Sequence, residues 1–123
     1  MDKHIAIVDD EPEVLTTLKR FLEKNSNYYI DIYSRPEDAL ESINMRNYDL
    51  ILLDIMMPKI NGLDVLKQIK EKNENIKVIM MTAYSTLNNT LRSDTLGADA
   101  YLEKPFPSLL TLKNTIDELL KAE

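Results

Sequence analysis

The chain has 123 residues, of which 44% are hydrophobic and 29% are charged, and its 15 basic and 21 acidic residues give a formal net charge of −6. This size and composition predict one globular domain over residues 1–123, and the acidic excess argues against direct binding of nucleic-acid phosphates. With no cysteine, one histidine and two glycines, the chain lacks the residues for zinc–thiolate sites, a pair of histidine metal ligands, P-loops and Gly-rich dinucleotide motifs.

Short apolar runs alternate with segments of helical periodicity about five times along the chain, and no run approaches the length of a membrane span. This alternation is typical of an α/β domain with a parallel sheet. The run at 50–53 is the most apolar and indicates a central strand, whereas the alternation at 29–33 indicates a half-exposed edge strand. The predicted strands are 5–8, 29–33, 50–53, 77–81 and 100–102.

A helix is predicted after each strand. The first begins at Pro12, which suits the first turn of a helix, and the second begins at a capping-box pattern over 34–37. Ser, Thr, Asn and Asp dominate the segment 85–96, which predicts a fourth helix of low local stability. The last helix begins at about Ser108, its expected cap. The predicted core positions of the other helices are Val14, Leu18, Phe21, Leu22, Ala39, Leu40, Ile43, Leu63, Leu66, Ile69, Leu109, Leu112, Ile116 and Leu119.

Charged and hydroxyl side chains stand at or just beyond the ends of four predicted strands. They are Asp9 and Asp10 after the first strand, Asp54 after the third, Thr82 after the fourth and Lys104 after the fifth. In an open parallel sheet the carboxyl ends of the strands share one edge, and the loops at that edge build the site. We therefore expect these five side chains to converge.

Three carboxylates and one ammonium at that edge carry a combined charge of −2. Two like charges about 4 Å apart repel by roughly 4 kcal/mol at an effective dielectric constant near 20, so the acids need a compensating cation. Oxygen ligands favour a hard divalent ion, and Mg²⁺ fits a site with few protein ligands. A carboxylate beside Mg²⁺, a lysine and a hydroxyl is suited to phosphoryl transfer, as an acceptor rather than as an ATP-using kinase.

Four segments of the chain form a family pattern when they are taken together. They read IVDDE at 7–11, LDIMMP at 53–58 with Gly62, MTA at 81–83 and GADAYLEKPF at 97–106. Each is a weak signal alone, but in this order and at these separations they resemble the receiver domain of two-component response regulators. The resemblance covers essentially the whole chain. It implies a doubly wound, flavodoxin-like (βα)5 sandwich whose parallel strands have the order 2-1-3-4-5.

The resemblance also implies a role for individual residues. Asp54 would accept a phosphoryl group from a sensor histidine kinase or a phosphotransfer protein, and Lys104 would contact the phosphate. Mg²⁺, with Mn²⁺ able to substitute, would be bound directly by Asp10, Asp54 and the backbone carbonyl of Met56, while Asp9 would act mostly through water.

A conformational switch is implied in the same way. Thr82 would move toward the phosphoryl group and Tyr101 would turn inward behind it, which reshapes the surface of the fourth helix, fifth strand and fifth helix. An output domain or target protein would read that surface. The resemblance further implies a cis bond between Lys104 and Pro105.

The implied protein is a cytoplasmic signalling domain rather than an enzyme, although it assists its own phosphorylation and dephosphorylation. It would bind neither nucleic acid nor membranes directly, and it would be a monomer or a phosphorylation-promoted dimer. Two other classes compete with this interpretation. A pseudo-receiver would use the fold without phosphorylation, but the complete set of acids, Thr82 and Lys104 argues against it. An aspartate-nucleophile phosphatase generally has a second acid two residues after its nucleophile, where this chain has Met56.

Overall fold

The computed structural model describes residues 2–83, 92–106 and 108–121. Within these ranges five parallel strands form one sheet of order β2-β1-β3-β4-β5, as predicted. The strands are β1 (His4–Val8), β2 (Tyr29–Tyr33), β3 (Leu50–Asp54), β4 (Lys77–Thr82) and β5 (Ala100–Glu103). The helices with defined bounds are α1 (Pro12–Asn25), α2 (Pro36–Ile43), α3 (Gly62–Lys72) and α5 (Leu109–Lys121).

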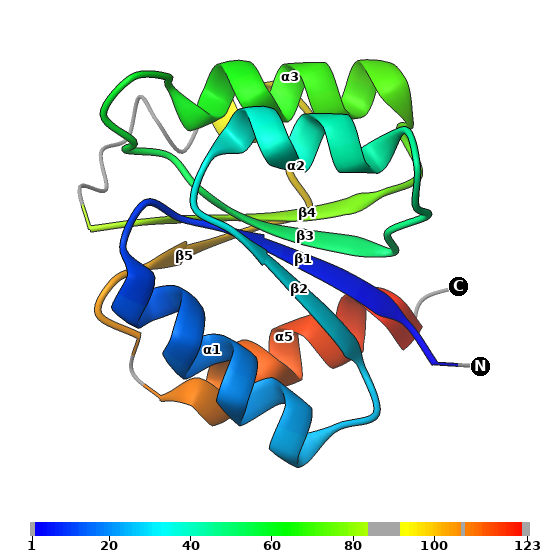
Figure 1. The fold of residues 1–123 in the computed structure, drawn as a ribbon, viewed down its shortest axis with the longest axis vertical. Coiled ribbons are helices and arrows are strands. Elements are labelled where there is room, and N and C mark those ends of the chain that lie inside the picture. Colours follow the sequence, from blue (N-terminus) through cyan, green and yellow to red (C-terminus); the bar gives the residue numbers. More distant parts are fainter. Residues whose placement is uncertain (1, 84–91, 107, 122–123) are drawn as a thin grey trace.

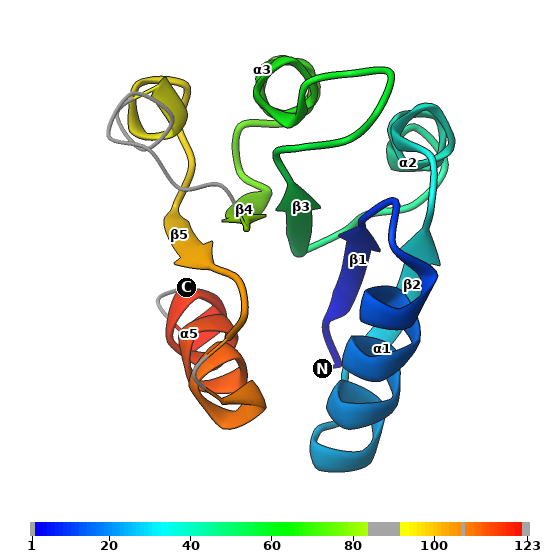
Figure 2. The ribbon, with the colours of Figure 1, turned by 90° about the vertical axis from the view of Figure 1, so that its left-hand side faces the viewer.

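The sheet lies between two layers of helices. Helices α2 and α3 cover one face, and α1 and α5 cover the other (Figure 1). Of the helix predicted at 85–96, residues 84–91 lie outside the described ranges, whereas 92–95 are helical and lie on the α3 side of the sheet (Figure 2). No helix in the described residues is long and apolar enough to cross a membrane.

Each face of the sheet has its own apolar core. Strand β3 is buried along its whole length, as expected of a central strand, and its side chains alternate between the two cores. Ile51 and Leu53 pack on the side of α2 and α3, while Leu50 and Leu52 pack on the side of α1 and α5. The prediction of a strand covered on both faces is confirmed.

The predicted apolar stripe of α1 is confirmed, with its centre slightly shifted. Leu18 and Leu22 are buried as predicted, but the third fully buried residue is Leu15, while Val14 and Phe21 are only partly buried. The same shift occurs in α5, where Leu120 is buried and the predicted positions Leu109 and Leu119 are partly buried. A helix that packs on a sheet buries a narrow stripe, so neighbouring apolar residues lie at its margin.

The capping box predicted at 34–37 is wrong. The residue that precedes α2 is Arg35, which is extended and forms no side-chain capping bond. Pro36 is the first helical residue, and a proline disfavours helical backbone in the residue before it, so the helix cannot begin earlier. The predicted cap of α5 is confirmed, because Ser108 Oγ accepts a hydrogen bond from the Thr111 backbone N–H at 3.0 Å.

Candidate functional site

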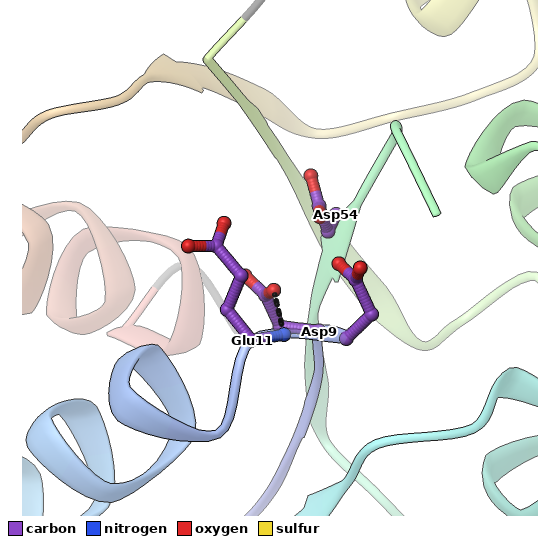
Figure 3. Close-up of side chains that lie close together, drawn as sticks. Asp9, Glu11 and Asp54 are labelled. Atoms are coloured by element: carbon purple, nitrogen blue, oxygen red, sulfur yellow. Dashed lines mark hydrogen bonds between the residues drawn. The ribbon is translucent and has the colours of Figure 1, made fainter. Parts of the chain in front are cut away.

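The ends of β1 and β3 bring together carboxylates that are far apart in the sequence. Asp9 directly follows β1, and Asp54 is the last residue of β3, which pairs beside β1 with Val8 opposite Leu53. Figure 3 shows the side chains of Asp9, Glu11 and Asp54 gathered at this edge of the sheet. The structure therefore brings Asp9 and Asp54 together as the sequence predicts.

The Asp9 side chain is fully buried and is held by two donors. Its Oδ1 accepts a hydrogen bond from the Glu11 backbone N–H at 2.9 Å, and its Oδ2 accepts one from Lys104 Nζ at 2.5 Å. Burial raises the pKa of the Asp9 carboxyl above its usual value, although these two bonds oppose the rise.

The Asp54 carboxylate ends the central strand and is only 3% exposed. Its Oδ1 lies 3.4 Å from the Met56 backbone nitrogen, and its Oδ2 lies 3.7 Å from Lys104 Nζ. Burial, followed by the negative charge of Asp9, raises the pKa of Asp54 to about 7. The carboxyl is therefore divided between its protonated and ionised forms near neutral pH, and a cation beside it would favour the ionised form.

Lys104 reaches the site because β5 pairs with β4. Just beyond the register pair of Thr82 and Glu103, the Lys104 backbone N–H donates to the Thr82 carbonyl at 2.8 Å. The following bond to Pro105 is cis, as the resemblance implies. The pairing of β5 with β4 thus places the Lys104 side chain beside Asp9 and Asp54.

The ammonium of Lys104 faces three carboxylates and its side chain is only 10% exposed. The distances from Nζ are 2.5 Å to Asp9, 3.5 Å to Glu11 and 3.7 Å to Asp54. Burial lowers the pKa of Lys104, but the hydrogen bond to Asp9 and the surrounding negative charges outweigh burial and raise the pKa above its usual value. The lysine therefore stays charged at neutral pH.

Four carboxylates come close enough to share one cation. One oxygen from each residue lies within 4.8 Å of the others, in the set Asp9, Asp10, Glu11 and Asp54. The single charge of Lys104 leaves this set strongly negative, and all of its donor atoms are oxygen. Such donors fit a hard divalent ion such as Mg²⁺, which agrees with the acidic pocket expected from the sequence. Met56, the other predicted ligand, follows β3 and lies beside Asp54.

Glu11 is the member of this cluster to which the sequence analysis assigned no role. Its place in the acidic run after β1 is the one feature of the sequence that could indicate a role in the site. A third acid at a helix start is ordinarily solvated, however, so this feature is weak. Its approach to Lys104 depends on the side-chain conformation of a residue 93 positions away. No local pattern in the sequence predicts that contact.

The two predicted switch residues lie on neighbouring strands. The Thr82 side chain is fully buried at the end of β4. Tyr101 on β5 lies opposite Met80 of β4 and packs against the core on the α3 side. Its hydroxyl oxygen is buried and has no hydrogen-bond partner within the described ranges. The Tyr101 hydroxyl is thus directed inward in this structure, and its role in a phosphorylation switch stays a prediction.

Gly62 allows α3 to begin directly against the end of β3. A Cβ atom at this position would lie 2.2 Å from the Asp54 carbonyl oxygen and 2.6 Å from the Ile55 Cα. The Gly62 N–H donates to the Ile55 carbonyl at 2.7 Å, and the Asn61 side chain caps the helix by accepting from the Leu63 N–H at 2.8 Å. These contacts therefore fix the loop between Asp54 and the start of α3.

Known proteins resemble this chain along most of its length. The family model of the response regulator receiver domain matches residues 5–117. The alkaline phosphatase synthesis transcriptional regulatory protein PhoP of Bacillus subtilis is 38% identical over 106 residues, which cover 86% of this chain and 44% of the relative. The transcriptional regulatory protein ResD of the same organism is 40% identical over 102 residues, covering 83% and 42%. The chain thus spans less than half the length of these relatives.

Solved structures agree with this assignment. A CheY-like receiver domain protein from Methanospirillum hungatei JF-1 is 33% identical, with a TM-score of 0.94 and coverage of 99% of this chain and 96% of the other. The response regulator TrrA of Thermotoga maritima, solved in complex with Mg²⁺ and BeF, is 40% identical, with a TM-score of 0.84 and coverage of 95% and 98%. Sequence, fold and site geometry agree, and the chain belongs to the response regulator receiver domain family of two-component systems.

Proposed function

We propose that Asp54 accepts a phosphoryl group from a phosphohistidine on a sensor histidine kinase or a phosphotransfer protein. The observation that carries this proposal is the position of the buried Asp54 carboxylate, beside the ammonium of Lys104 and inside a cluster of acids. Membership of the receiver family supports the same role. Residues 1–123 would act as one phosphoacceptor domain rather than as an enzyme.

Mg²⁺ is the cation that we propose for the acidic cluster, with Mn²⁺ able to substitute. The residues that would hold it are Asp10, Asp54 and the Met56 backbone carbonyl, with Asp9 acting through water. When bound, the ion offsets the negative charge of the carboxylates and of the incoming phosphoryl oxygens. The all-oxygen composition of the cluster supports this choice.

The residues of the chain would perform the transfer as an in-line displacement. An oxygen of the ionised Asp54 carboxylate attacks phosphorus, so that a P–O bond forms while the P–N bond of the donor breaks. The electron pair of the broken bond stays on the imidazole nitrogen. Lys104, now 3.7 Å from Asp54 Oδ2, needs only a small movement to bind a phosphoryl oxygen.

Thr82 and Tyr101 would couple the phosphoryl group to the surface of the domain. The Thr82 hydroxyl would move toward the phosphoryl oxygens, and the inward Tyr101 would fill the space behind it. The surface formed by 92–95, β5 and α5 would then present a different shape to an output domain or a target protein. The proposed setting is the cytoplasm, with the domain a monomer or a phosphorylation-promoted dimer.

The first prediction concerns phosphorylation of the purified protein by acetyl phosphate. We expect one acid-labile phosphoryl group per chain in the presence of Mg²⁺, and none after chelation with EDTA. Asp54→Asn should abolish incorporation, because the amide is not a nucleophile for this reaction. Intact-protein mass spectrometry measures the modification directly.

Asp64→Asn is the matched control, because Asp64 is exposed in the first turn of α3 and the substitution removes the same charge. This variant should be modified like the parent. Full incorporation by Asp54→Asn would refute the assignment. No incorporation by the parent would favour a phosphorylation-independent interaction module, and sustained phosphate release over many turnovers would favour a phosphatase.

A further inference from the structure

Glu11 occupies a helix-capping position but does not cap the helix. It directly precedes α1 with extended backbone, and its side chain forms no capping hydrogen bond. Its backbone N–H instead donates to Asp9 Oδ1 at 2.9 Å, and its side chain lies beside Asp9 at the edge of the sheet (Figure 3). The carboxylate Oε1 lies 3.5 Å from Lys104 Nζ.

The ammonium of Lys104 has carboxylate partners other than Asp54. Asp9 is its nearest partner at 2.5 Å, Glu11 follows at 3.5 Å, and Asp54 is the most distant of the three at 3.7 Å. The ammonium donates hydrogen bonds to Asp9 and Glu11, so a phosphoryl oxygen that binds Lys104 has to share its charge and its three donors with these carboxylates. Asp9 and Glu11, the two nearer carboxylates, therefore restrain the lysine more than Asp54 does.

Asp9 and Glu11 differ in how they would release Lys104. Asp9 is fully buried, and we propose that it contacts Mg²⁺ through water, so its charge is offset when the cation binds. Glu11 is 60% exposed and is not among the residues that we propose to hold the cation, so its charge is left to pair with the lysine. Glu11 is thus the lasting competitor for Lys104.

We propose that Glu11 is a positioning residue that acts through Lys104: it competes with the phosphoryl group for the ammonium and thereby weakens anion binding and slows phosphorylation at Asp54. This inference rests on the proposed function. An exposed ion pair contributes little, so we expect removal of the pair to strengthen phosphoryl binding by about two- to fivefold rather than by orders of magnitude.

Three variants separate the ion pair from a general charge effect. Glu11→Gln removes the charge, whereas Glu11→Asp keeps the charge on a shorter side chain that retreats from Lys104. Glu13→Gln is the matched control, because Glu13 is exposed in the first turn of α1 and forms no ion pair with Lys104 in the described part of the chain. All three variants keep residues 1–123 and an intact Asp54.

The experiment titrates each protein with beryllium fluoride at saturating Mg²⁺ and follows binding by NMR. The Mg²⁺ affinity of each variant is measured first, so that saturation is established. We expect Glu11→Gln and Glu11→Asp to bind beryllium fluoride about two- to fivefold more tightly than the parent and Glu13→Gln to match the parent. In the metal-free protein, the side-chain nitrogen resonance of Lys104 should shift in both Glu11 variants and stay in place in Glu13→Gln.

The inference alone would be overturned by unchanged beryllium fluoride affinity in both Glu11 variants, or by an equal gain in Glu13→Gln. Tighter binding in Glu11→Gln with no gain in Glu11→Asp would also contradict it, since charge rather than contact with Lys104 would then be responsible. Failure of the inference about Glu11 is distinguishable from failure of the proposed function. If the parent itself bound no beryllium fluoride and accepted no phosphate, the phosphoacceptor role would fall, and this inference with it.

Discussion

Gly62 controls the position of the proposed phosphoacceptor without contributing a side chain to the site. The backbone of α3 approaches the end of β3 so closely that a Cβ atom at Gly62 would lie 2.2 Å from the Asp54 carbonyl oxygen. The atoms that this Cβ would meet, the Asp54 carbonyl oxygen and the Ile55 Cα, belong to the backbone, so relief requires the helix start or the strand end to move. The geometry of Asp54 therefore depends on the absence of a side chain eight residues away.

We expect Gly62→Ala to lower the free energy of unfolding by about 1–3 kcal/mol, because the added methyl group overpacks a site that has no room for it. The same change should slow phosphorylation by acetyl phosphate, since it displaces the backbone of Asp54. Chemical denaturation and the labelling rate measure the two effects.

Gly97→Ala is the control for this prediction. Gly97 has a φ of +97°, so alanine there is strained by about 1–2 kcal/mol, but a Cβ atom would meet only the Lys70 side chain at 3.7 Å or more. The variant should lose stability and keep the labelling rate of the parent. Equal slowing in both variants would show that loss of stability, rather than displacement of Asp54, limits the reaction.

Residues of the site were predictable to the extent that the backbone alone determines their positions. Asp9, Asp54 and Lys104 converge because each follows or ends a parallel strand, and strand ends can be located from apolar runs. The contact of Glu11 with Lys104 was not predictable, because side-chain conformations on two different loops decide it.

Helix starts differ in how the chain defines them. Pro12 and Pro36 each occupy the first turn of a helix, and neither preceding residue forms a side-chain cap. In α5 the start is defined by Ser108, whose hydroxyl oxygen accepts a hydrogen bond from the Thr111 N–H. Two elements of the fold thus begin at a proline, and a third begins at a hydroxyl cap.

This difference predicts unequal effects of two Ser→Ala substitutions. Ser108→Ala should lower the free energy of unfolding by about 0.5–2 kcal/mol, because an N–H of the first turn loses its acceptor. Ser34→Ala should change this free energy by less than about 0.5 kcal/mol. Ser34 is exposed and lies one residue before Arg35, which is the residue at the capping position of α2. Urea denaturation of both variants compares them, and a larger loss in Ser34→Ala would contradict the assignment of the caps.

At the scale of elements, all five strands and their order agreed with the sequence-based expectations, whereas the helix starts did so only in part. Apolar runs locate strands because a central strand is buried along its length. The pattern at 34–37 also fits a capping box, but the restriction that Pro36 imposes on Arg35 decides which residue precedes the helix. The steric restriction that Pro36 imposes thus overrides the capping-box pattern that begins at Ser34.

At the scale of the whole molecule, the site stores electrostatic repulsion that folding must overcome. Asp9 and Asp54 are both buried, and burial raises the pKa of each carboxyl above its usual value. Lys104 offsets only part of their charge. The net charge of −6 describes mostly scattered surface acids, whereas these few buried acids determine how the protein responds to pH and to cations.

The stability of the metal-free protein should therefore fall as pH rises from about 4 to about 7. The pKa of Asp54 is raised from 3.8 in the unfolded reference to about 7 in the fold, so within this range the unfolded chain has lost a proton that the folded protein retains. The interval of about three pKa units corresponds to at most about 4 kcal/mol. The raised pKa of Lys104 affects stability only at pH values above this range.

Asp54→Asn should lack most of this decline and should be more stable than the metal-free parent at pH 7.5. Asp64→Asn, with the same loss of charge on the surface, should follow the parent. Denaturation midpoints measured across this pH range compare the three proteins. A lower midpoint for Asp54→Asn than for the parent at pH 7.5 would show that crowding of acids is the wrong description of the site.

The proposed function depends most on Asp54 as the residue that carries the phosphoryl group. Borohydride reduction of the acetyl phosphate-treated protein, followed by peptide mass spectrometry, converts an aspartyl phosphate into a homoserine and identifies its position. We predict homoserine at position 54 in the sample that contains Mg²⁺ and at no position in the sample treated with EDTA. Homoserine at another aspartate, or the same amount at position 54 with EDTA present from the start, would contradict the account.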